Sequence, residues 1–179
     1  MHRALKVVAI AVAFVVVAGC LLFWAAPAQL AQLTKALVFQ PLVVPTGSME
    51  PAIRIGDRVI VSKTSGSPSA GDIVALDDPN GHSLLMVKRV VAMCGQTVDI
   101  KDGAVWVDGA RLDEPYVNGK LSEPGTVALP VQVPEGYLWV MGDNRGNSGD
   151  SRFYGPVSLS DVSGKVAAIY WPPNHAKQF

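Results

Sequence analysis

The chain has 179 residues, enough for one domain with a small additional segment. Its 15 basic and 15 acidic residues balance to a formal net charge of zero, so a surface that binds nucleic acid is not expected. The two cysteines and three histidines are scattered along the sequence, a pattern that predicts no disulfide framework, no metal site and no other cofactor.

The first predicted element is a long apolar segment near the N-terminus. Residues 7–34 contain no charged side chain, and roughly 20 apolar residues suffice to cross a bilayer as a helix. We therefore predict a short cytoplasmic N-terminus over residues 1–6 and a transmembrane anchor over residues 7–28. Because Arg3 and Lys6 precede the anchor, the positive-inside rule places the rest of the chain on the outer, periplasmic face of the cytoplasmic membrane.

A removable signal peptide is the alternative interpretation of this segment. Ala26 and Ala28 form an A-x-A pattern directly after the apolar run, as expected of a cleavage site. The run is longer than the roughly 7–15 apolar residues of a typical signal peptide, and Pro27 fits an extended cleavage site poorly. The length favours a retained anchor, and both interpretations place the remainder outside the cytoplasm.

Beyond a juxtamembrane segment over residues 29–38, the pattern becomes that of short strands. Thirteen prolines and 17 glycines favour many turns over a helical bundle. A helical turn is expected at 158–162, and a long connector at 120–136. Apolar runs bounded by turn residues predict strands near residue 39, at 57–63, on both sides of a turn at 79–81, around the Asp-Gly pairs of 102–109, at 137–141 and at 164–171. The fold class is therefore mainly β, a compact antiparallel domain over residues 39–179.

Ser48 lies in the stretch "VPTGSMEP", between a glycine and a methionine. Ser, Gly and Pro are ordinary turn residues, so the local sequence alone indicates a turn. A nucleophile held in a rigid loop is the second interpretation, and it requires a base from elsewhere in the chain. His82 is the only histidine that lies inside the exported body rather than at an end of the chain. Its Pro-Asn-Gly-His context is that of a solvated loop, and the spacing does not favour a Ser-His-Asp triad.

Lys88 is the other candidate base, because it interrupts the most apolar stretch of the exported part, "LLMVKRVVAM". A strand of this composition is usually buried on at least one face, and burial lowers the pKa of a lysine. A neutral amine at this position could accept the proton of a serine. The alternative is that Lys88 packs its stem on an edge strand and keeps its ammonium group in water.

The third polar segment, "MGDNRGNSGDSRFYGPV" at 141–157, follows a predicted strand. Its glycines and asparagines allow backbone conformations with positive φ, which indicates a tightly folded loop. One interpretation is a polar surface loop held by Asp–Arg pairs. The density of hydrogen-bonding groups beside a strand end favours a functional loop instead.

Together these segments resemble the bacterial type I signal peptidases. The resemblance rests on "TGSMEP", a strand with Lys-Arg and "GDNRGNSGDSRFYG", and it continues through "IGDRVIVSK", "GDIVALDDP" and "DGAVWVDGARLDEPYV". It extends over residues 39–173, and the order and spacing of the motifs agree. It implies a membrane-anchored serine endopeptidase that removes signal peptides from exported preproteins after A-x-A sites.

The resemblance also implies a role for each matching residue. Ser48 corresponds to the nucleophile and Lys88 to the general base of a Ser-Lys dyad. The Ser48 N–H and the Thr46 hydroxyl correspond to the oxyanion donors, and Ser148 to the residue that orients the lysine. Charged residues expected to brace the site are Arg89, Asp143, Asp150 and Arg152. Apolar residues expected to line the substrate pockets are Leu42, Val44, Met49, Ile53, Met86 and Val87.

The implied partners are signal peptides that emerge from the export machinery and the lipid bilayer near Phe39 and Leu42, and a monomer is expected. Some positions depart from the common family pattern: Thr46 replaces a frequent serine, Ala52 a threonine, Gly146 a common aspartate, and "MCGQTV" leaves Cys94 as a free thiol.

The remaining alternatives are a conjugation-type processing peptidase, a self-cleaving repressor domain and an inactive, membrane-anchored peptide-binding β module. The anchor and the absence of a DNA-binding module argue against the repressor. The intact Ser48, Lys88 and Ser148 argue against the inactive module.

Overall fold

The computed structural model of the protein describes residues 38–79, 81, 85–117 and 119–179. The chain divides into two compact units, 1–38 and 39–179. The predicted anchor, the A-x-A pattern that follows it and His82 lie outside the described residues. Within the described part, no helix is long and apolar enough to cross a membrane.

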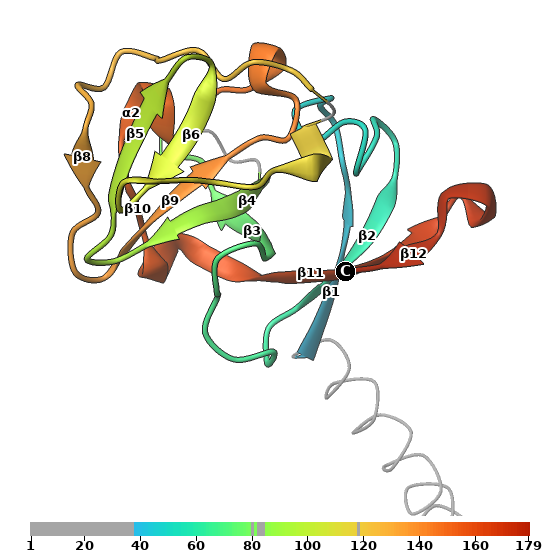
Figure 1. The fold of residues 1–179 in the computed structure, drawn as a ribbon. Coiled ribbons are helices and arrows are strands. Elements are labelled where there is room, and N and C mark those ends of the chain that lie inside the picture. Colours follow the sequence, from blue (N-terminus) through green and yellow to red (C-terminus); the bar gives the residue numbers. More distant parts are fainter. Residues whose placement is uncertain (1–37, 80, 82–84, 118) are drawn as a thin grey trace, which may run out of the picture. The chain divides into compact units, whose positions relative to one another are not determined.

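The larger of two antiparallel sheets in the second unit has eight strands (Figure 1). Seven of them lie side by side in the order β1-β2-β11-β3-β4-β9-β10, and β12 pairs with β11. Their bounds are β1 Phe39–Val43, β2 Arg58–Ser62, β3 Ile73–Asp77, β4 Leu85–Met93, β9 Tyr137–Met141, β10 Val157–Ser158, β11 Val162–Trp171 and β12 Lys177–Gln178. Strands that are neighbours in space are therefore often distant in sequence.

The smaller sheet has four strands in the order β7-β6-β5-β8. Their bounds are β5 Thr97–Lys101, β6 Ala104–Val107, β7 Ala110–Arg111 and β8 Val131–Gln132. Asp102 and Asp108 adopt positive φ at the two predicted Asp-Gly turns, a conformation that Asp tolerates better than most residues. Short helices connect the strands: η1 Pro115–Val117, η2 Arg145–Asn147, α2 Ser151–Tyr154, η3 Leu159–Asp161 and η4 Pro173–His175.

The structure confirms the mainly β antiparallel fold and the strands with a clear apolar pattern. The predicted helical turn is the 3₁₀ helix η3, and the connector predicted at 120–136 contains β8. Strands β7, β8, β10 and β12 have only two residues each. A two-residue strand has no recognisable periodicity, so such strands follow from the pairing of longer neighbours.

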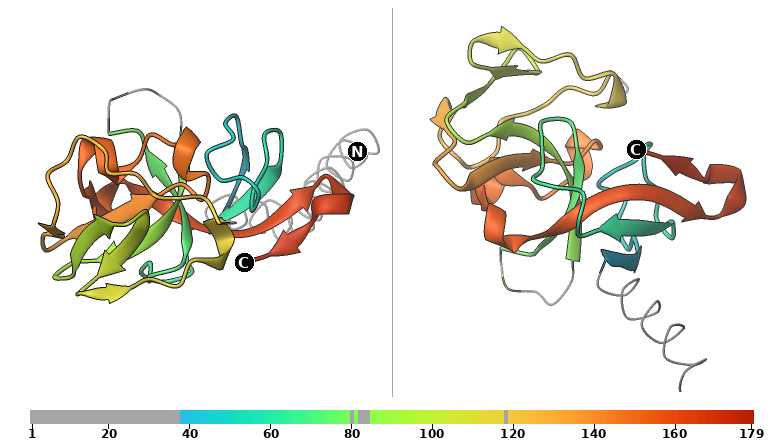
Figure 2. Two further views of the ribbon diagram at one scale, coloured as in Figure 1. Left: turned by 45° about the horizontal axis from the view of Figure 1, so that its top comes forward. Right: turned by 90° about the horizontal axis from the view of Figure 1, so that it is seen from below.

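Strand β11 is the longest strand of the described chain and runs across the whole domain (Figure 2). It pairs with β2 along one edge and with β3 along the other. At Gly164 a side chain would approach the Ser62 carbonyl oxygen to 2.5 Å, so the close strand contact requires glycine. β11 thereby joins the part of the sheet formed by β1 and β2 to the part formed by β3, β4 and β9.

Three apolar clusters form the core, and each packs together strands from which the polar loops begin. Val59, Val61, Ile73 and Ile169 belong to a cluster below β1, β2 and β11. A second cluster contains Trp139 and joins β9 to the smaller sheet. The third lies against β3, β4 and β9 and includes Val74, Leu76, Val90 and Val140. The loops between these packed strands are consequently fixed at both ends.

Candidate active site

Ser48 lies in the turn between β1 and β2 and is only 6 % exposed. The Ile53 N–H donates to the Met49 carbonyl, and the Glu50 N–H donates to the Gly47 carbonyl, so the segment forms tight turns. Met49 and Ile53 are completely buried in the cluster below β1 and β2. Ser48 is thus held on a loop that is anchored in the core directly after it.

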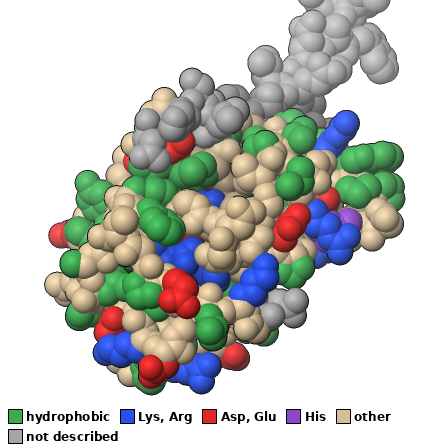
Figure 3. Space-filling model, turned by 90° about the horizontal axis from the view of Figure 1, so that it is seen from above, with side chains coloured by type: hydrophobic (Ala, Val, Ile, Leu, Met, Phe, Trp, Pro, Cys, Tyr) green, Lys and Arg blue, Asp and Glu red, His purple; other side chains and the backbone are tan. Residues whose placement is uncertain are grey.

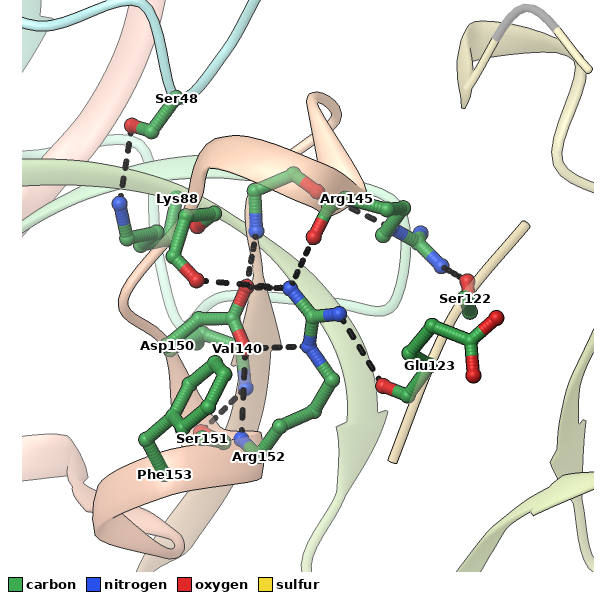
Figure 4. A network of polar contacts seen from close by, with 12 residues as sticks. Ser48, Lys88, Ser122, Glu123, Val140, Arg145, Asp150, Ser151, Arg152 and Phe153 are labelled. Atoms are coloured by element: carbon green, nitrogen blue, oxygen red, sulfur yellow. Dashed lines mark hydrogen bonds and ion pairs between the residues drawn. The ribbon is translucent and has the colours of Figure 1, made fainter. Parts of the chain in front are cut away.

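Lys88 lies on β4 and is 4 % exposed. Side chains alternate along a strand, so Lys88 shares a face with Met86 and Val90, both of which contribute to an apolar cluster. The Lys88 Nζ donates a hydrogen bond to the Ser48 Oγ at 2.9 Å, and Figure 4 shows the two side chains pointing toward one another. The structure therefore brings these two predicted site residues into direct contact.

The surroundings of Lys88 favour its neutral form. Burial lowers the pKa of Lys88 from its ordinary value of 10.5, because desolvation disfavours the ammonium ion. The carboxylate of Asp150 opposes this change in pKa, and the guanidinium of Arg152 adds to it. A lysine with a lowered pKa within hydrogen-bonding distance of a hydroxyl has the geometry and the charge state of a general base.

Thr46 contributes a second hydroxyl beside Ser48. The Thr46 Oγ1 lies 3.3 Å from the Ser48 Oγ, and Thr46 itself is exposed. Its hydroxyl therefore faces the same space as the serine and is open to a bound molecule. A hydroxyl rotates freely and can donate to an anion that forms there.

Ser148 lines the same cleft as Ser48 and Lys88. Its Oγ is buried and has no hydrogen-bond partner among the described residues. A Cβ atom at Gly142 would lie 2.3 Å from the Ser148 Oγ and 2.5 Å from the Ser48 carbonyl oxygen. Gly142 thus lies between these two serines, and its missing side chain allows both to approach the end of β9.

The four predicted bracing residues form two ion pairs. Arg89 donates two hydrogen bonds to Asp143, at 2.8 and 2.7 Å. Arg152 donates from Nε and Nη2 to the two carboxylate oxygens of Asp150. Bidentate pairs of this kind fix orientation as well as charge. The Arg89–Asp143 pair holds the loop after β9 against β4, and the Arg152–Asp150 pair acts within that loop.

Arg152 has further partners that close the loop on itself. Its guanidinium donates to the carbonyl oxygens of Arg145, Ser148 and Glu123 (Figure 4). Asp150 also caps α2 through the Arg152 N–H and accepts from the Gly142 N–H. The loop predicted from its Gly, Asn and Asp content is therefore tightly folded.

Several residues of the segment between β7 and β8 also contact this loop, and the sequence analysis did not identify them. Glu114 pairs with Arg145, which also donates to the Ser122 hydroxyl. The Tyr116 ring lies 4.0 Å from the Arg89 guanidinium carbon. The only signal in the sequence was the match of "DEPYV" to the family pattern, which does not say what these side chains touch.

The cleft at Ser48 and Lys88 has a volume of about 610 Å³. Of the six predicted pocket residues, Val44, Met86 and Val87 line it. Met49 and Ile53 lie in the core beneath the loop, and Leu42 packs against the same cluster. Lining residues that the sequence analysis did not single out are Pro45, Asp78, Leu85, Asn147, Gly149, Phe153 and Tyr154.

Within the described part of the chain, no group of three or more His, Cys, Asp or Glu side chains could hold a metal ion. Cys94 is exposed and unpaired. On the face drawn in Figure 3, Lys and Arg side chains are interspersed with Asp and Glu side chains, so this face offers no uniformly basic surface to a phosphate backbone.

A family model described as "Signal peptidase, peptidase S26" matches residues 3–171 of the chain. The chain belongs to this family. It is 38% identical over 154 residues to the "Probable signal peptidase I-1" of Synechocystis, covering 80% of this chain and 76% of that protein. It is 36% identical over 162 residues to the "Signal peptidase I" of Bacillus licheniformis, covering 83% and 86% of the two chains.

A crystal structure of a signal peptidase I from Enterococcus faecalis matches with a TM-score of 0.50 and 29% identity, over 56% of this chain and 97% of that one. The described domain is thus a signal-peptidase-like β domain. Among the alternatives left open by the sequence, the family and the relatives support a serine endopeptidase with signal peptidase I activity, which removes signal peptides.

Proposed function

We propose that the signal peptidase activity of this chain uses Ser48 as the nucleophile and Lys88 as the general base. The hydrogen bond of 2.9 Å between the Lys88 Nζ and the Ser48 Oγ is the observation that carries this proposal. Both side chains are buried, and the pKa of Lys88 is lowered. A general base must lie within hydrogen-bonding reach of the proton it takes and must be neutral at the working pH.

In the proposed reaction, the neutral Lys88 accepts the hydroxyl proton of Ser48 as the Oγ attacks the scissile carbonyl carbon. The Ser48 N–H and the Thr46 hydroxyl stabilise the oxyanion of the tetrahedral intermediate. The Lys88 ammonium then donates its proton to the departing amine, which is the new N-terminus of the mature protein. Lys88 next takes a proton from water as the water oxygen attacks the acyl carbonyl carbon. It then returns this proton to the Ser48 Oγ as the ester bond breaks and the carboxyl product leaves.

The remaining polar residues hold this arrangement in place. Ser148 is proposed to orient Lys88, a role supported by its position beside Lys88 in the lining of the same cleft. The Arg89–Asp143 and Arg152–Asp150 pairs are proposed to brace the loop. Burial of these ion pairs makes loss of one partner costly, because an uncompensated charge then remains in the interior.

We propose that the cleft accepts substrates with an A-x-A sequence before the scissile bond. Val44, Met86 and Val87 line the cleft beside the dyad, and they favour small apolar side chains. Met49 and Ile53 form the packed layer beneath Ser48, and Leu42 packs against that layer, so these three residues are proposed to support the pocket walls from below. Selectivity for alanine in such a site is steric, since close-packed walls do not yield to extra methylene groups.

The enzyme is further proposed to be a single-pass protein of the cytoplasmic membrane that acts as a monomer on its outer face. The uncharged run over residues 7–34 supports the anchor. Phe39, Val43 and Trp171 are apolar yet 44 to 56 % exposed, and Val43 and Trp171 both lie opposite Arg58 on β2. Exposed apolar side chains of this kind are suited to contact with lipid.

The dyad is tested by measuring cleavage of a preprotein with an A-x-A site by the Ser48→Ala and Lys88→Ala variants. Each is expected to lower kcat by about a hundred- to ten-thousandfold, the typical contribution of general base catalysis or more. Ser160→Ala and Lys101→Ala are matched controls, because both side chains are exposed, and they are expected to retain full activity. A full rate in either dyad variant would show that the assignment is wrong.

A further inference from the structure

Asn144, in the loop after β9, connects the segment between β7 and β8 to the nucleophile loop. The Lys120 Nζ donates to the Asn144 Oδ1 at 2.7 Å, and the Asn144 Nδ2 donates to the Gly47 carbonyl oxygen at 3.0 Å. The Asn144 N–H donates to the Ser48 carbonyl oxygen at 2.9 Å. Asn144 is 7 % exposed, so these contacts form in a site with little competing water.

These hydrogen bonds give the Asn144 amide one orientation. An amide has a carbonyl oxygen that only accepts and an NH₂ group that only donates. Lys120 can only donate and the Gly47 carbonyl can only accept, so the oxygen faces Lys120 and the nitrogen faces Gly47. Both contacts therefore require the same orientation, and Lys120 stabilises the one in which the amide nitrogen points at the nucleophile loop.

The bond to Gly47 also sets the direction of the Ser48 N–H. The Gly47 carbonyl and the Ser48 N–H belong to the same planar peptide unit, and in a trans peptide they point in opposite directions. Holding the carbonyl oxygen on one side therefore aims the N–H at the other. The Asn144 N–H holds the next carbonyl, that of Ser48, so the peptide units on both sides of the Ser48 Cα are fixed.

We propose that Asn144 is a positioning residue that aims the Ser48 N–H at the oxyanion, and that Lys120 acts by orienting the Asn144 amide. This inference rests on the proposed function of Ser48. Neither side chain touches the reacting atoms: Asn144 acts through the Gly47–Ser48 peptide, and Lys120 acts through Asn144. The pair couples the nucleophile loop to a segment about 70 residues further along the chain.

The Ser48 N–H stabilises the reaction only when the oxyanion forms, and not when the substrate binds. Asn144→Ala is therefore expected to lower kcat by about a hundredfold, as small misplacements of catalytic groups do, while KM changes by less than about twofold. The midpoint of the pH profile of kcat should stay at its wild-type value, because the surroundings of Lys88 are unchanged. A loss of structural support alone would lower the melting temperature without this division between kcat and KM.

The inhibitor that tests the oxyanion site directly is a peptide aldehyde ending in Ala-x-Ala, which forms a tetrahedral adduct with an active serine. Its Ki is expected to rise by the same factor by which kcat falls in Asn144→Ala. When a mutation changes the rate of the reaction, the affinity of a transition-state analogue changes by a similar factor. The affinity of a ground-state ligand changes instead with the binding of the substrate. An unchanged Ki would contradict the proposed role.

A double-mutant cycle tests whether Lys120 acts through Asn144. Lys120→Ala is expected to lower kcat by roughly tenfold in the wild-type background and to have no further effect in Asn144→Ala. Lys120→Arg should restore most of the activity, because it keeps a donor for the amide oxygen. Lys101→Ala, which removes a surface ion pair, is the control. Its effect on kcat should be the same in the wild-type and Asn144→Ala backgrounds.

The outcomes separate the two proposals. Independent, multiplicative effects of Lys120→Ala and Asn144→Ala on kcat would overturn the positioning pair and leave the dyad intact. A fully active Ser48→Ala variant would overturn the dyad itself. If Asn144→Ala does not fold, Lys120→Ala decides, because Lys120 is exposed and its loss does not affect the core: an unchanged kcat and Ki in that variant would overturn the proposal.

Discussion

Lys88 is a basic side chain that the fold removes from water. It lies on the face of β4 that carries Met86 and Val90, and it is 4 % exposed. The pKa of Lys88 is lowered mainly by desolvation. Its neighbour Arg89 lies on the alternate face, where Asp143 binds it. Two adjacent cations in the sequence thus have different environments, one suited to proton transfer and the other to an ion pair.

The lowered pKa of Lys88 predicts that kcat rises with pH. The neutral amine is the reactive form, so the fraction of active enzyme grows as the pH rises through the pKa of Lys88, and the midpoint should lie below the ordinary value of 10.5. The measurement is single-turnover cleavage of a peptide substrate across the alkaline range. Lys101→Ala should give the wild-type profile. A chemical step that does not change between about pH 6 and about pH 9 would contradict this role of Lys88.

At this scale the sequence anticipated the contact between Lys88 and Ser48 better than the positions of the expected pocket residues. Composition left Lys88 open between a buried base and an edge position with its ammonium group in water, and the family resemblance favoured the base. In the structure Lys88 is buried and lies against Ser48. Met49 and Ile53 were expected in the pocket from their motif positions, but they pack in the core beneath the loop. No sequence signal singled out Asn144, because a local pattern cannot show a contact with Gly47 across the fold.

The end of β9 is the element that brings the nucleophile loop and the polar loop together. Gly142 directly follows β9, and a side chain there would overlap the Ser48 carbonyl oxygen and the Ser148 Oγ. Its N–H donates to the Asp150 carboxylate. The end of β9, the nucleophile loop at Ser48 and the polar loop at Ser148 thus meet within van der Waals distance at Gly142.

Gly142→Ala is expected to lower kcat by about a hundredfold, because the added methyl group must displace the Ser48 backbone or the Ser148 side chain. It should also lower the free energy of unfolding by roughly 1–3 kcal/mol, as overpacking does. The measurements are steady-state cleavage and urea denaturation. Gly146→Ala is the matched control in the same loop, where an added Cβ meets nothing within 4 Å. A wild-type kcat in Gly142→Ala would show that this contact does not constrain Ser48.

Elements with many alternating apolar residues were predictable, and elements defined by their neighbours were not. β2, β4, β9 and β11 each have at least five residues and a buried face. β8 has two residues and exists because β5 offers an edge for pairing. The same limit applies to the segment that carries Glu114, Tyr116 and Lys120: its polar side chains form no pattern until the loop that they contact is in place.

At the scale of the whole molecule, residues 39–179 form a compact unit with their own core. Every contact described for the dyad, the cleft and the bracing loop is made by residues from Leu42 onward. The chemistry therefore depends on this unit, whereas the proposed anchor determines where the enzyme works.

A protein that consists of residues 39–179 alone is expected to fold and to cleave a short, soluble A-x-A peptide. Its kcat/KM should match that of the full chain in detergent within about threefold, because a domain with its own core folds independently. Urea denaturation and peptide cleavage are the measurements. If this truncated protein unfolds or loses cleavage, the N-terminal segment contributes to the active site. Cleavage of membrane-inserted preproteins should fall in the truncated protein, since it lacks the proposed anchor.

The position of β11 determines when during synthesis the enzyme becomes active. Ser48 precedes β2 and Lys88 lies on β4, and the strand order β2-β11-β3-β4 places β11 between the two parts of the sheet that carry them. β11 begins at Val162 and follows both of these segments in the sequence. A nascent chain therefore contains Ser48 and Lys88 long before the strand that lies between their parts of the sheet. The proposed dyad is expected to form only after β11 has been synthesised.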